Sequence, residues 1–349
     1  MSPRTADIQM ESPAAIAAID DLLAAVGIQH GSRKTLGPGA DKRRQPPVSR
    51  RPAPRVASEV KVAPLQIPAW QKKHPWLLHG FSTRLGGVSS VYQPGSRLRD
   101  LNLGFTASDD RAKVEENRKR LIRAVVGEKS GKIPSLVTLK QIHSSLIREV
   151  NAVPPAEGLK GDAMVTREQG ILLAIQTADC VPVLVADTRQ RIVAAFHAGW
   201  RGTLARIVEN GIGRMRAEFG TRAQDLTAAV GPGIGQCCYA VGEDLRFDFE
   251  SQFEYASSLF REVYDSDPIR EKYPLLFLTA RAPGHSNIGP SLHLDLPEAN
   301  RRQLLDAGVP EKAIHVVDAC TSCHPKQFFS HRAQQGFTGR MMSVIGVQG

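Results

Sequence analysis

The chain has 349 residues, of which 42% are hydrophobic and 23% are charged, a composition typical of soluble globular proteins. No apolar run approaches the roughly 20 residues that cross a bilayer, so no membrane-spanning segment is predicted. The net charge of +10 is typical of a nucleic-acid-binding protein, but residues 31–62 carry nine basic and two acidic side chains and thus +7 of it. We therefore expect no basic platform for specific nucleic-acid recognition in the rest of the chain.

The N-terminal part has the composition of a solvated arm. Residues 13–27 carry apolar side chains at helical spacing and predict a short amphipathic helix, whereas residues 29–63 are rich in Pro, Gly and Arg without periodicity. We predict a disordered basic arm over residues 1–62, which contacts anionic partners weakly, and a catalytic domain over residues 63–349. Asp20 and Asp21 interrupt the apolar stretch near the N-terminus, which argues against a signal peptide and favours a cytoplasmic location.

The first half of the domain predicts alternating strands and loops around one long helix. A strand is expected over residues 77–83, followed by a tight loop over residues 84–90 because Gly86 and Gly87 are adjacent. Residues 109–125 predict a helix with Asp109 or Asp110 as its N-cap. Residues 137–141 predict a strand that ends at His143.

The second half is rich in short apolar runs. Strands are predicted over residues 171–176, 181–187, 191–197, 226–230, 314–317 and 342–347. Helices are predicted over residues 203–219, ending at Gly220, and from Pro297 to Asp306. Because helices do not separate these strands regularly, we expect one mixed domain of helices and strands and not a purely parallel sheet.

Three metal-binding side chains stand at the ends of apolar runs: His143, Cys180 and His197. Two imidazoles and one thiolate suit zinc, and a set of three protein ligands leaves a coordination position open for water or substrate. Zinc in such a site lowers the pKa of water to about 7 and so supplies a nucleophile at neutral pH. Spacing alone is a weak signal, because a lone buried histidine or cysteine is more often part of the core than a metal ligand.

Several ordered segments resemble the YfiH/laccase-domain family, which was catalogued as polyphenol oxidoreductase and later recognised as purine nucleoside phosphorylase. The resemblance covers about residues 75–347 and excludes the N-terminal arm. Its most specific segments are LKQIHSS (139–145), TADCVPVLVAD (177–187) and AAFHAGWRG (194–202), supported by HGFSTRLGGVSS (79–90), GDAMVT (161–166) and AAVGPGIGQCCYAVGEDL (228–245).

The resemblance implies an activity, a cofactor and a fold. It implies zinc held by His143, Cys180 and His197, with copper as an alternative ion at the same ligands. The implied reaction is phosphorolysis of adenosine, inosine and methylthioadenosine to the free base and ribose 1-phosphate, together with deamination of adenosine. The implied partners are thus a small-molecule nucleoside and phosphate. The implied fold is α+β, with mixed β-sheets stacked on each other and covered by helices in α/β/β/α layers.

Phosphate requires cationic partners, and Arg84 and Arg201 are the candidates because each lies in one of the resembling segments. Arg201 follows the proposed ligand His197 by four residues, at or just before a helix start. Asp179 is a candidate for orienting a ligand imidazole or acting as a base. Structural ion pairs for the arginines, and a turn-capping role for Asp179, are the alternatives.

Four further cysteines admit several interpretations. Adjacent Cys237 and Cys238 are expected to be small buried hydrophobes, with a second metal site as the alternative. Cys320 and Cys323, followed by His324, match the pattern of c-type haem attachment, which requires export; a redox dithiol and half of a zinc site are the other interpretations. Cys323 departs from the pattern of the resembling family, so its role stays open.

Two other enzyme classes compete with a nucleoside-cleaving enzyme. A multicopper oxidase requires repeated His-x-His pairs, and none occurs among the ten histidines of the chain. A metal-independent cysteine hydrolase would use Cys180 as nucleophile and His143 or His197 as base. This second class fits another label of the resembling family, peptidoglycan editing factor. Chelation distinguishes the cysteine hydrolase from a metal-dependent enzyme, since the activity of a cysteine hydrolase survives removal of the metal.

Overall fold

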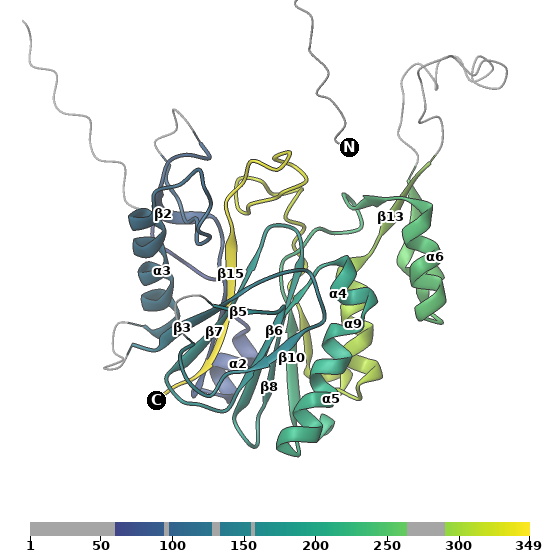
Figure 1. The fold of residues 1–349 in the computed structure, drawn as a ribbon, viewed down its shortest axis with the longest axis horizontal. Coiled ribbons are helices and arrows are strands. Elements are labelled where there is room, and N and C mark those ends of the chain that lie inside the picture. The colour runs from purple at the N-terminus through teal and green to yellow at the C-terminus, as the bar shows by residue number, and fades with distance from the viewer. Residues whose placement is uncertain (1–59, 94–97, 128–132, 155–157, 264–289) are drawn as a thin grey trace, which may run out of the picture. The chain divides into compact units, whose positions relative to one another are not determined.

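The computed structural model describes residues 60–93, 98–127, 133–154, 158–263 and 290–349. These residues belong to one compact unit that spans Val56–Gly349 (Figure 1). The predicted helix over residues 13–27, and all but the last three residues of the predicted arm, lie outside the described residues. Within the described part, every helix is too short or too polar to cross a membrane.

The first of two central sheets has five strands in the order β1-β15-β7-β3-β5. Antiparallel pairing joins β1 to β15 and β15 to β7, and parallel pairing joins β7 to β3 and β3 to β5. The strands are β1 (Leu77–Phe81), β15 (Met341–Val347), β7 (Ile171–Thr177), β3 (Ser135–Lys140) and β5 (Leu159–Lys160). The sheet is thus mixed, as predicted.

The second central sheet has six strands in the order β14-β10-β8-β9-β6-β4. The pairings at its two edges, β14 with β10 and β6 with β4, are parallel, and the inner pairings are antiparallel. The strands are β14 (Ile314–Val316), β10 (Leu226–Val230), β8 (Val181–Asp187), β9 (Ile192–Ala198), β6 (Ala163–Thr166) and β4 (Ile147–Glu149).

Smaller elements complete the described fold. A third sheet has the order β11-β13-β12, and β2 lies outside the three sheets. These strands are β11 (Ala240–Val241), β13 (Ser291–Leu294), β12 (Phe260–Val263) and β2 (Leu85–Ser89). The α-helices are α2 (Pro68–Lys73), α3 (Arg111–Val126), α4 (Trp200–Leu204), α5 (Ile207–Phe219), α6 (Glu243–Gln252) and α9 (Leu296–Asp306). Short 3-10 helices are η1 (Ala223–Asp225), η2 (Ala256–Leu259) and η3 (Glu311–Ala313).

The two central sheets pack face to face, and helices cover their outer faces (Figure 1). Side chains alternate between the two faces of a strand, and β8 shows the consequence. Its Leu184 and Ala186 pack between the sheets with residues of β7 and β15, whereas Val183 and Val185 pack under α5 and α9. On the other side, α3 covers the outer face of the first sheet. This arrangement confirms the predicted α+β fold with α/β/β/α layers.

Two helices begin where the sequence predicts. The Asp110 carboxylate caps α3 by accepting a hydrogen bond from the Ala112 amide at 2.8 Å. The Asp295 carboxylate caps α9 by accepting from the Glu298 amide at 3.0 Å, and Pro297 stands in the first turn.

The loop predicted over residues 84–90 is wrong, because residues 85–89 form strand β2. The glycines there permit close packing of two chain segments. A Cβ atom at position 87 would lie 2.0 Å from the carbonyl oxygen of Asp100, so only glycine fits. The glycine pair therefore marks a close backbone approach, which a sequence pattern does not distinguish from a turn.

The helix predicted over residues 203–219 is interrupted. Arg206 has φ +55°, in the left-handed region, and separates α4 from α5. Its guanidinium compensates by pairing with Glu209 at 2.7 Å and by binding the carbonyl oxygen of Gln252. The break lets α4 begin directly after Gly199, next to the strand end that carries His197. The helix does end at Gly220, which adopts the predicted left-handed C-cap.

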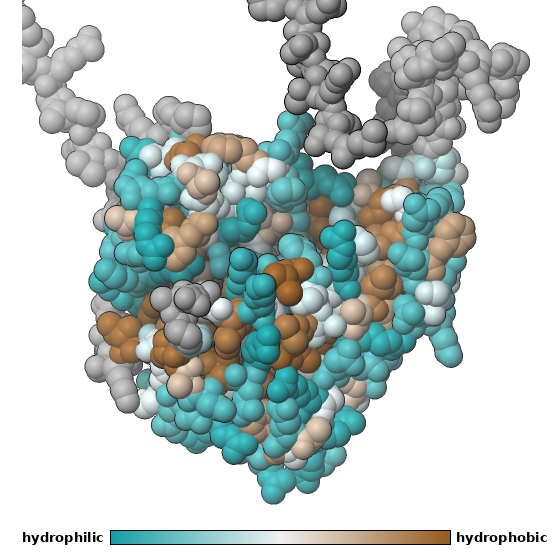
Figure 2. Space-filling view, viewed as in Figure 1, coloured by the Kyte–Doolittle hydropathy of each residue, from teal (hydrophilic) through white to brown (hydrophobic). Residues whose placement is uncertain are grey.

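The surface of the described residues is mixed. Figure 2 shows hydrophobic side chains gathered across the middle of one face, over the strands, and hydrophilic side chains over most of its lower part.

Candidate metal centre and active site

The three predicted ligands come from two sheets that meet at one edge. His143 follows β3 of the first sheet, and Cys180 immediately precedes β8 in the connection that runs from the first sheet to the second. His197 is the next-to-last residue of β9 and faces Pro182 in the β8–β9 pairing. The sequence predicts that all three converge at a strand end. The stacking of two sheets, invisible in the sequence, adds His143 from the other layer.

The ligand atoms of His143, Cys180 and His197 all lie within 4.8 Å of one another. The two imidazole rings meet edge to face, with centroids 4.9 Å apart. Two borderline nitrogen ligands and one sulfur ligand at this spacing fit a single zinc ion or a related transition metal. The chemistry of the three donors and their convergence therefore fit a mononuclear metal centre.

Asp162 organises this centre, and the sequence reasoning did not single it out. It precedes β6 and is fully buried. One carboxylate oxygen accepts from His197 Nδ1 at 2.8 Å and from the His143 amide at 3.0 Å. The other accepts from the Ser144 amide and hydroxyl, both at 2.7 Å. Because a carboxylate only accepts, His197 Nδ1 donates to Asp162, and Nε2 is the nitrogen that a metal could bind in place of a proton.

The same carboxylate holds His143 in an unusual backbone conformation. His143 has φ +57°, which costs free energy in a residue that bears a Cβ. The amides of Ile142, His143 and Ser144 all point at Asp162, so the turn is fixed by these three donors. The GDAMVT segment carries a signal for Asp162, namely an acid just before a buried strand, but its partners become visible only in the fold.

Electrostatics in the centre favour a thiolate. Burial opposes ionisation of Cys180, but the charge of His197 and hydrogen bonds from both imidazoles outweigh it and lower the pKa of the thiol to about 6. Burial likewise opposes protonation of His197, yet the Cys180 charge and the Asp162 hydrogen bond raise its pKa to about 9. Burial disfavours the Asp162 carboxylate too, but hydrogen bonds from His197 and Ser144 hold its pKa well below the usual range.

Gly199 explains part of the HAGWRG segment. A Cβ atom at this position would lie 3.0 Å from the Cys180 sulfur and 3.3 Å from Cδ2 of His143. Any larger residue would press on two ligands at once. The glycine therefore preserves the space in which the ligands converge.

A cavity of about 620 Å³ opens onto the three ligands. This size suits a small-molecule substrate. Among the residues that line it are the three cationic side chains Lys140, Arg332 and Arg340, together with His331. Tyr239 also lines the cavity, and burial raises the pKa of its hydroxyl to about 12, so it stays a hydrogen-bond donor at neutral pH. The other lining residues are Leu139, Gln141, Gln176, Thr177, Ala178, Asp179 and Ile234.

The two predicted phosphate-binding arginines lie outside the lining. Arg84 is buried and donates two hydrogen bonds to the Asp100 carboxylate, each 2.9 Å, with its charged carbon 4.5 Å from the centre of the Phe329 ring. Arg201 is exposed and lies over the Trp200 ring. The cavity lining does not include Arg201.

Asp179 lines the cavity, but its carboxylate binds neighbouring loops and not the imidazole of a ligand histidine. Its carboxylate accepts from the Thr321 hydroxyl and from the Arg332 amide, both at 2.7 Å. Its φ of +95° is stabilised further by the Ile234 amide, which donates to its carbonyl oxygen at 2.8 Å. Asp179 thus anchors the two loops that carry Ile234 and Arg332 to the ligand strand.

Comparison with known proteins agrees with this geometry. The family described as "Multi-copper polyphenol oxidoreductase laccase" matches residues 78–348. "Purine nucleoside phosphorylase YlmD" of Geobacillus stearothermophilus is 33% identical over 289 residues, which are 79% of this chain and 96% of the relative. A "Purine nucleoside phosphorylase" of Deinococcus radiodurans is 36% identical over 269 residues, 77% of this chain and 88% of the relative.

Solved structures show the same fold. The crystal structure of the hypothetical protein YfiH from Bacillus licheniformis superposes with a TM-score of 0.67 at 29% identity, covering 82% of this chain and 97% of that one. The structure of YlmD from Geobacillus stearothermophilus gives a TM-score of 0.61 at 31% identity, covering 78% and 93%. The span that the family matches, residues 78–348, excludes the whole of the predicted arm and includes every residue of the candidate centre.

Proposed function

The chain belongs to the multi-copper polyphenol oxidoreductase laccase family, and from this premise we propose that it is a zinc-dependent purine nucleoside phosphorylase. It would cleave adenosine, inosine and methylthioadenosine with phosphate, and would also deaminate adenosine. Relatives that are 33%, 36% and 34% identical to this chain carry the name purine nucleoside phosphorylase, which supports the phosphorolytic reaction. The observation that carries the proposal is the convergence of His143, Cys180 and His197 on the wall of one substrate-sized cavity.

We propose that these three side chains hold zinc, with Asp162 setting the tautomer of His197. When bound, zinc would supply Lewis-acid polarisation of the purine and a nucleophilic water at neutral pH. The protein itself arranges the ligands, because Asp162 holds both the His197 ring and the His143 turn. Such ordering before binding lowers the conformational entropy lost when the ligands are fixed.

The phosphate would bind at the cationic part of the cavity. Of the described lysines and arginines, Lys140, Arg332 and Arg340 line the cavity, so we propose that they hold the phosphate oxygens. For Arg201, which is not part of the cavity lining, we propose only a weaker attraction of the phosphate through its charge. For Arg84 we propose a structural role, since Asp100 and Phe329 already engage its guanidinium.

The Tyr239 hydroxyl and the amides of Gln141 and Gln176 are the remaining polar groups suited to a nucleoside. The Gln141 side chain makes two hydrogen bonds of 2.8 Å to the backbone of Gln176. Its Nε2 donates to the backbone carbonyl of Gln176, and its Oε1 accepts from the backbone N–H of Gln176. This pairing fixes Gln141, so the Gln176 side chain and Tyr239 are the better candidates for the base or ribose.

A direct experiment is turnover of inosine with phosphate, followed by chromatography of released hypoxanthine. We expect His197→Ala to lose more than the roughly 10–100-fold that follows removal of an outer partner of a metal ligand. His74→Ala changes a half-buried histidine beside Trp76 that lies outside the cavity lining, so it is the matched control and should keep full turnover. A folded His197→Ala protein that turns over inosine normally would contradict the proposal.

One observation favours a second candidate, a metal-independent cysteine hydrolase. The lowered pKa of Cys180 and the raised pKa of His197 favour a thiolate–imidazolium pair, the arrangement that activates cysteine nucleophiles. This candidate predicts activity that survives chelation and is abolished by alkylation of Cys180. The zinc proposal predicts loss on chelation and recovery when zinc is returned. A copper-dependent oxidoreductase at the same ligands predicts recovery with copper and oxidation of phenols.

A further inference from the structure

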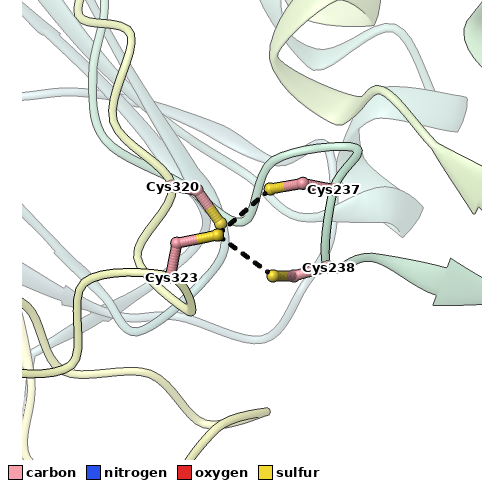
Figure 3. A group of neighbouring side chains, drawn as sticks. All are labelled: Cys237, Cys238, Cys320 and Cys323. Atoms are coloured by element: carbon pink, nitrogen blue, oxygen red, sulfur yellow. Dashed lines mark hydrogen bonds between the residues drawn. The ribbon is translucent and has the colours of Figure 1, made fainter.

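A second group of metal-binding side chains lies apart from the three ligands described above. Cys237 and Cys238 come from the loop between β10 and β11, and Cys320 and Cys323 come from the loop between β14 and β15 (Figure 3). The four sulfur atoms all lie within 4.8 Å of one another. The expectation that Cys237 and Cys238 are buried hydrophobes is wrong, because Cys237 is exposed and Cys238 is half-buried.

The spacing of the sulfurs fits one tetrahedral ion. The sulfur of Cys323 lies 3.3 Å from those of both Cys237 and Cys238. Four thiolates around one zinc ion, each about 2.3 Å from the metal, would be separated by about 3.8 Å. A disulfide requires about 2.0 Å and joins only two sulfurs. In an iron–sulfur cluster the four cysteines are shared among two or four iron atoms, so their sulfurs do not all surround one ion as the four sulfurs do here.

The backbone of the two loops is built around these sulfurs. Gly233 and Cys320 form a parallel bridge, and the Thr321 amide donates to the Gly233 carbonyl at 2.9 Å. The Gly235 amide donates to the Cys320 sulfur at 3.3 Å, a hydrogen bond that stabilises a thiolate ligand. Hydrogen bonds of the backbone thus hold the two loops in the position that the four sulfurs require.

Gly235 also provides the space that the cluster needs. A Cβ atom there would lie 3.2 Å from the Cys320 Cβ and 3.4 Å from the Cys237 sulfur. Both contacts are tight, so a side chain would push the two cysteines apart. Glycine at this position lets the loop that bears Cys237 approach the loop that bears Cys320.

The cluster stands directly behind the wall of the active-site cavity. Thr321 directly follows Cys320, and its hydroxyl donates a hydrogen bond to the Asp179 carboxylate at 2.7 Å. Ile234 and Tyr239, which flank the Cys237–Cys238 pair, line the cavity. A bond network that fixes these two loops therefore also fixes part of the cavity wall.

We propose that Cys237, Cys238, Cys320 and Cys323 together bind one soft divalent transition-metal ion, zinc above all, as a closed structural site that joins the two loops. Four protein ligands leave no open position, so this site holds structure and performs no chemistry on substrate. Each of the four thiols gives up its proton as the ion binds, and no oxidant or reductant is required. The site is independent of the proposed phosphorylase activity, because its ligands are separate from His143, Cys180 and His197.

The stoichiometry of bound zinc tests the proposal. The full chain, purified with a thiol reductant and dialysed against zinc-containing buffer, should hold two zinc ions by inductively coupled plasma mass spectrometry. Cys323→Ser should hold one, and its exposed side chain makes misfolding from lost packing unimportant. Ser322→Ala, in the same turn, is the matched control and should keep both. His197→Ala should hold one, now at the four cysteines.

Cobalt identifies the ligands of the retained ion. His197→Ala loaded with cobalt should show the intense sulfur-to-cobalt charge-transfer absorption of a tetrathiolate site, and a further Cys323→Ser substitution should weaken it. Absence of bound metal from folded His197→Ala would overturn the proposal. So would peptide mapping that finds Cys323 in a disulfide with Cys237 or Cys238 in the protein purified with reductant, since that would make the group a redox pair.

A measurement on the unaltered protein covers the case in which a substitution prevents folding. In the zinc-loaded chain, iodoacetamide should leave the four cysteines unlabelled, and chelation should expose them to labelling, as read by peptide mass spectrometry. Equal labelling rates before and after chelation would overturn the proposal. Loss of inosine turnover alone would not bear on it, so the two sites are tested separately.

Discussion

Asp162 is the residue on which the geometry of the active site most depends. Five donors, from His197 and residues 142–144, converge on its two oxygens. The sequence identified the three ligands through the family resemblance, but it did not identify Asp162, because the partners of a carboxylate depend on which strands become neighbours. Here the pairing of β6 with β9 brings Asp162 beside His197.

Replacing Asp162 with asparagine should loosen the metal without changing the ligands. The asparagine side chain would place an N–H group against the N–H and O–H donors that now bind Asp162. We therefore expect a roughly 10–100-fold loss of zinc affinity and a free energy of unfolding that is lower by about 1–3 kcal/mol. Competition with a chromogenic chelator and urea unfolding measure the two effects. Asp225→Asn, which alters only an exposed pair with Arg222, should change neither; unchanged affinity in Asp162→Asn would contradict the assigned role.

The protonation of Cys180 gives a prediction about pH. Its pKa in the metal-free protein is lowered to about 6, so the thiolate should persist at neutral pH and be lost as the pH falls through about 6. The rate of alkylation of Cys180 in chelated protein should therefore rise with pH around that value. Peptide mass spectrometry at short reaction times measures it, and a midpoint near the ordinary thiol value of about 8.5 would contradict the described electrostatics.

At the scale of elements, helix α5 contains two glycines with opposite roles. A Cβ at Gly211 would lie 1.9 Å from the Phe196 ring, whereas a Cβ at Gly213 would meet nothing within 4 Å. Gly211→Ala should therefore destabilise the protein by about 1–3 kcal/mol through overpacking. Gly213→Ala should stabilise it by up to about 1 kcal/mol, because glycine weakens a helix interior. Thermal unfolding of both variants measures the difference, and equal effects would contradict this packing.

Elements with local signals are predictable from the sequence, and those that depend on distant contacts are not. An N-capping aspartate locates α3, Pro297 in the first turn locates α9, and runs of Val and Ile locate the central strands. By contrast, the Gly86–Gly87 pair predicts a turn wrongly, because its reason, the Asp100 backbone, is remote in sequence. The break at Arg206 has no local signal for the same reason: its compensating partner, the Gln252 carbonyl, lies in another element.

At the scale of the whole molecule, the active site belongs entirely to the compact unit. Every residue that lines the cavity lies between Leu139 and Arg340, and Val62 packs partly buried against the core beneath α3. Deletion of residues 1–59 should therefore leave kcat for inosine within about twofold. Steady-state kinetics of the truncated and full chains measure this. A tenfold loss with unchanged thermal stability would assign the N-terminal residues a part in catalysis.

The stacking of two sheets brings the ligands together, and this could be expected only through the family resemblance. No sequence pattern within one segment indicates that β3 and β9 lie in different sheets, or that the ends of these strands bring His143 and His197 together. The same is true of the four-cysteine group, whose two pairs are more than 80 residues apart in the sequence and meet through the Gly233–Cys320 bridge. The resemblance pointed to the first set of ligands, and the fold brings together two cysteine pairs that the sequence offered only separately as alternative metal ligands.

The most direct test of the metal-centred account is a zinc titration of chelated Cys323→Ser protein, in which the phosphate-dependent release of hypoxanthine from inosine is followed. This background leaves the centre of His143, Cys180 and His197 as the zinc site of interest. We predict no turnover before zinc is added and a rate that rises until about one ion is bound per chain. Full turnover in the metal-free protein would contradict the account.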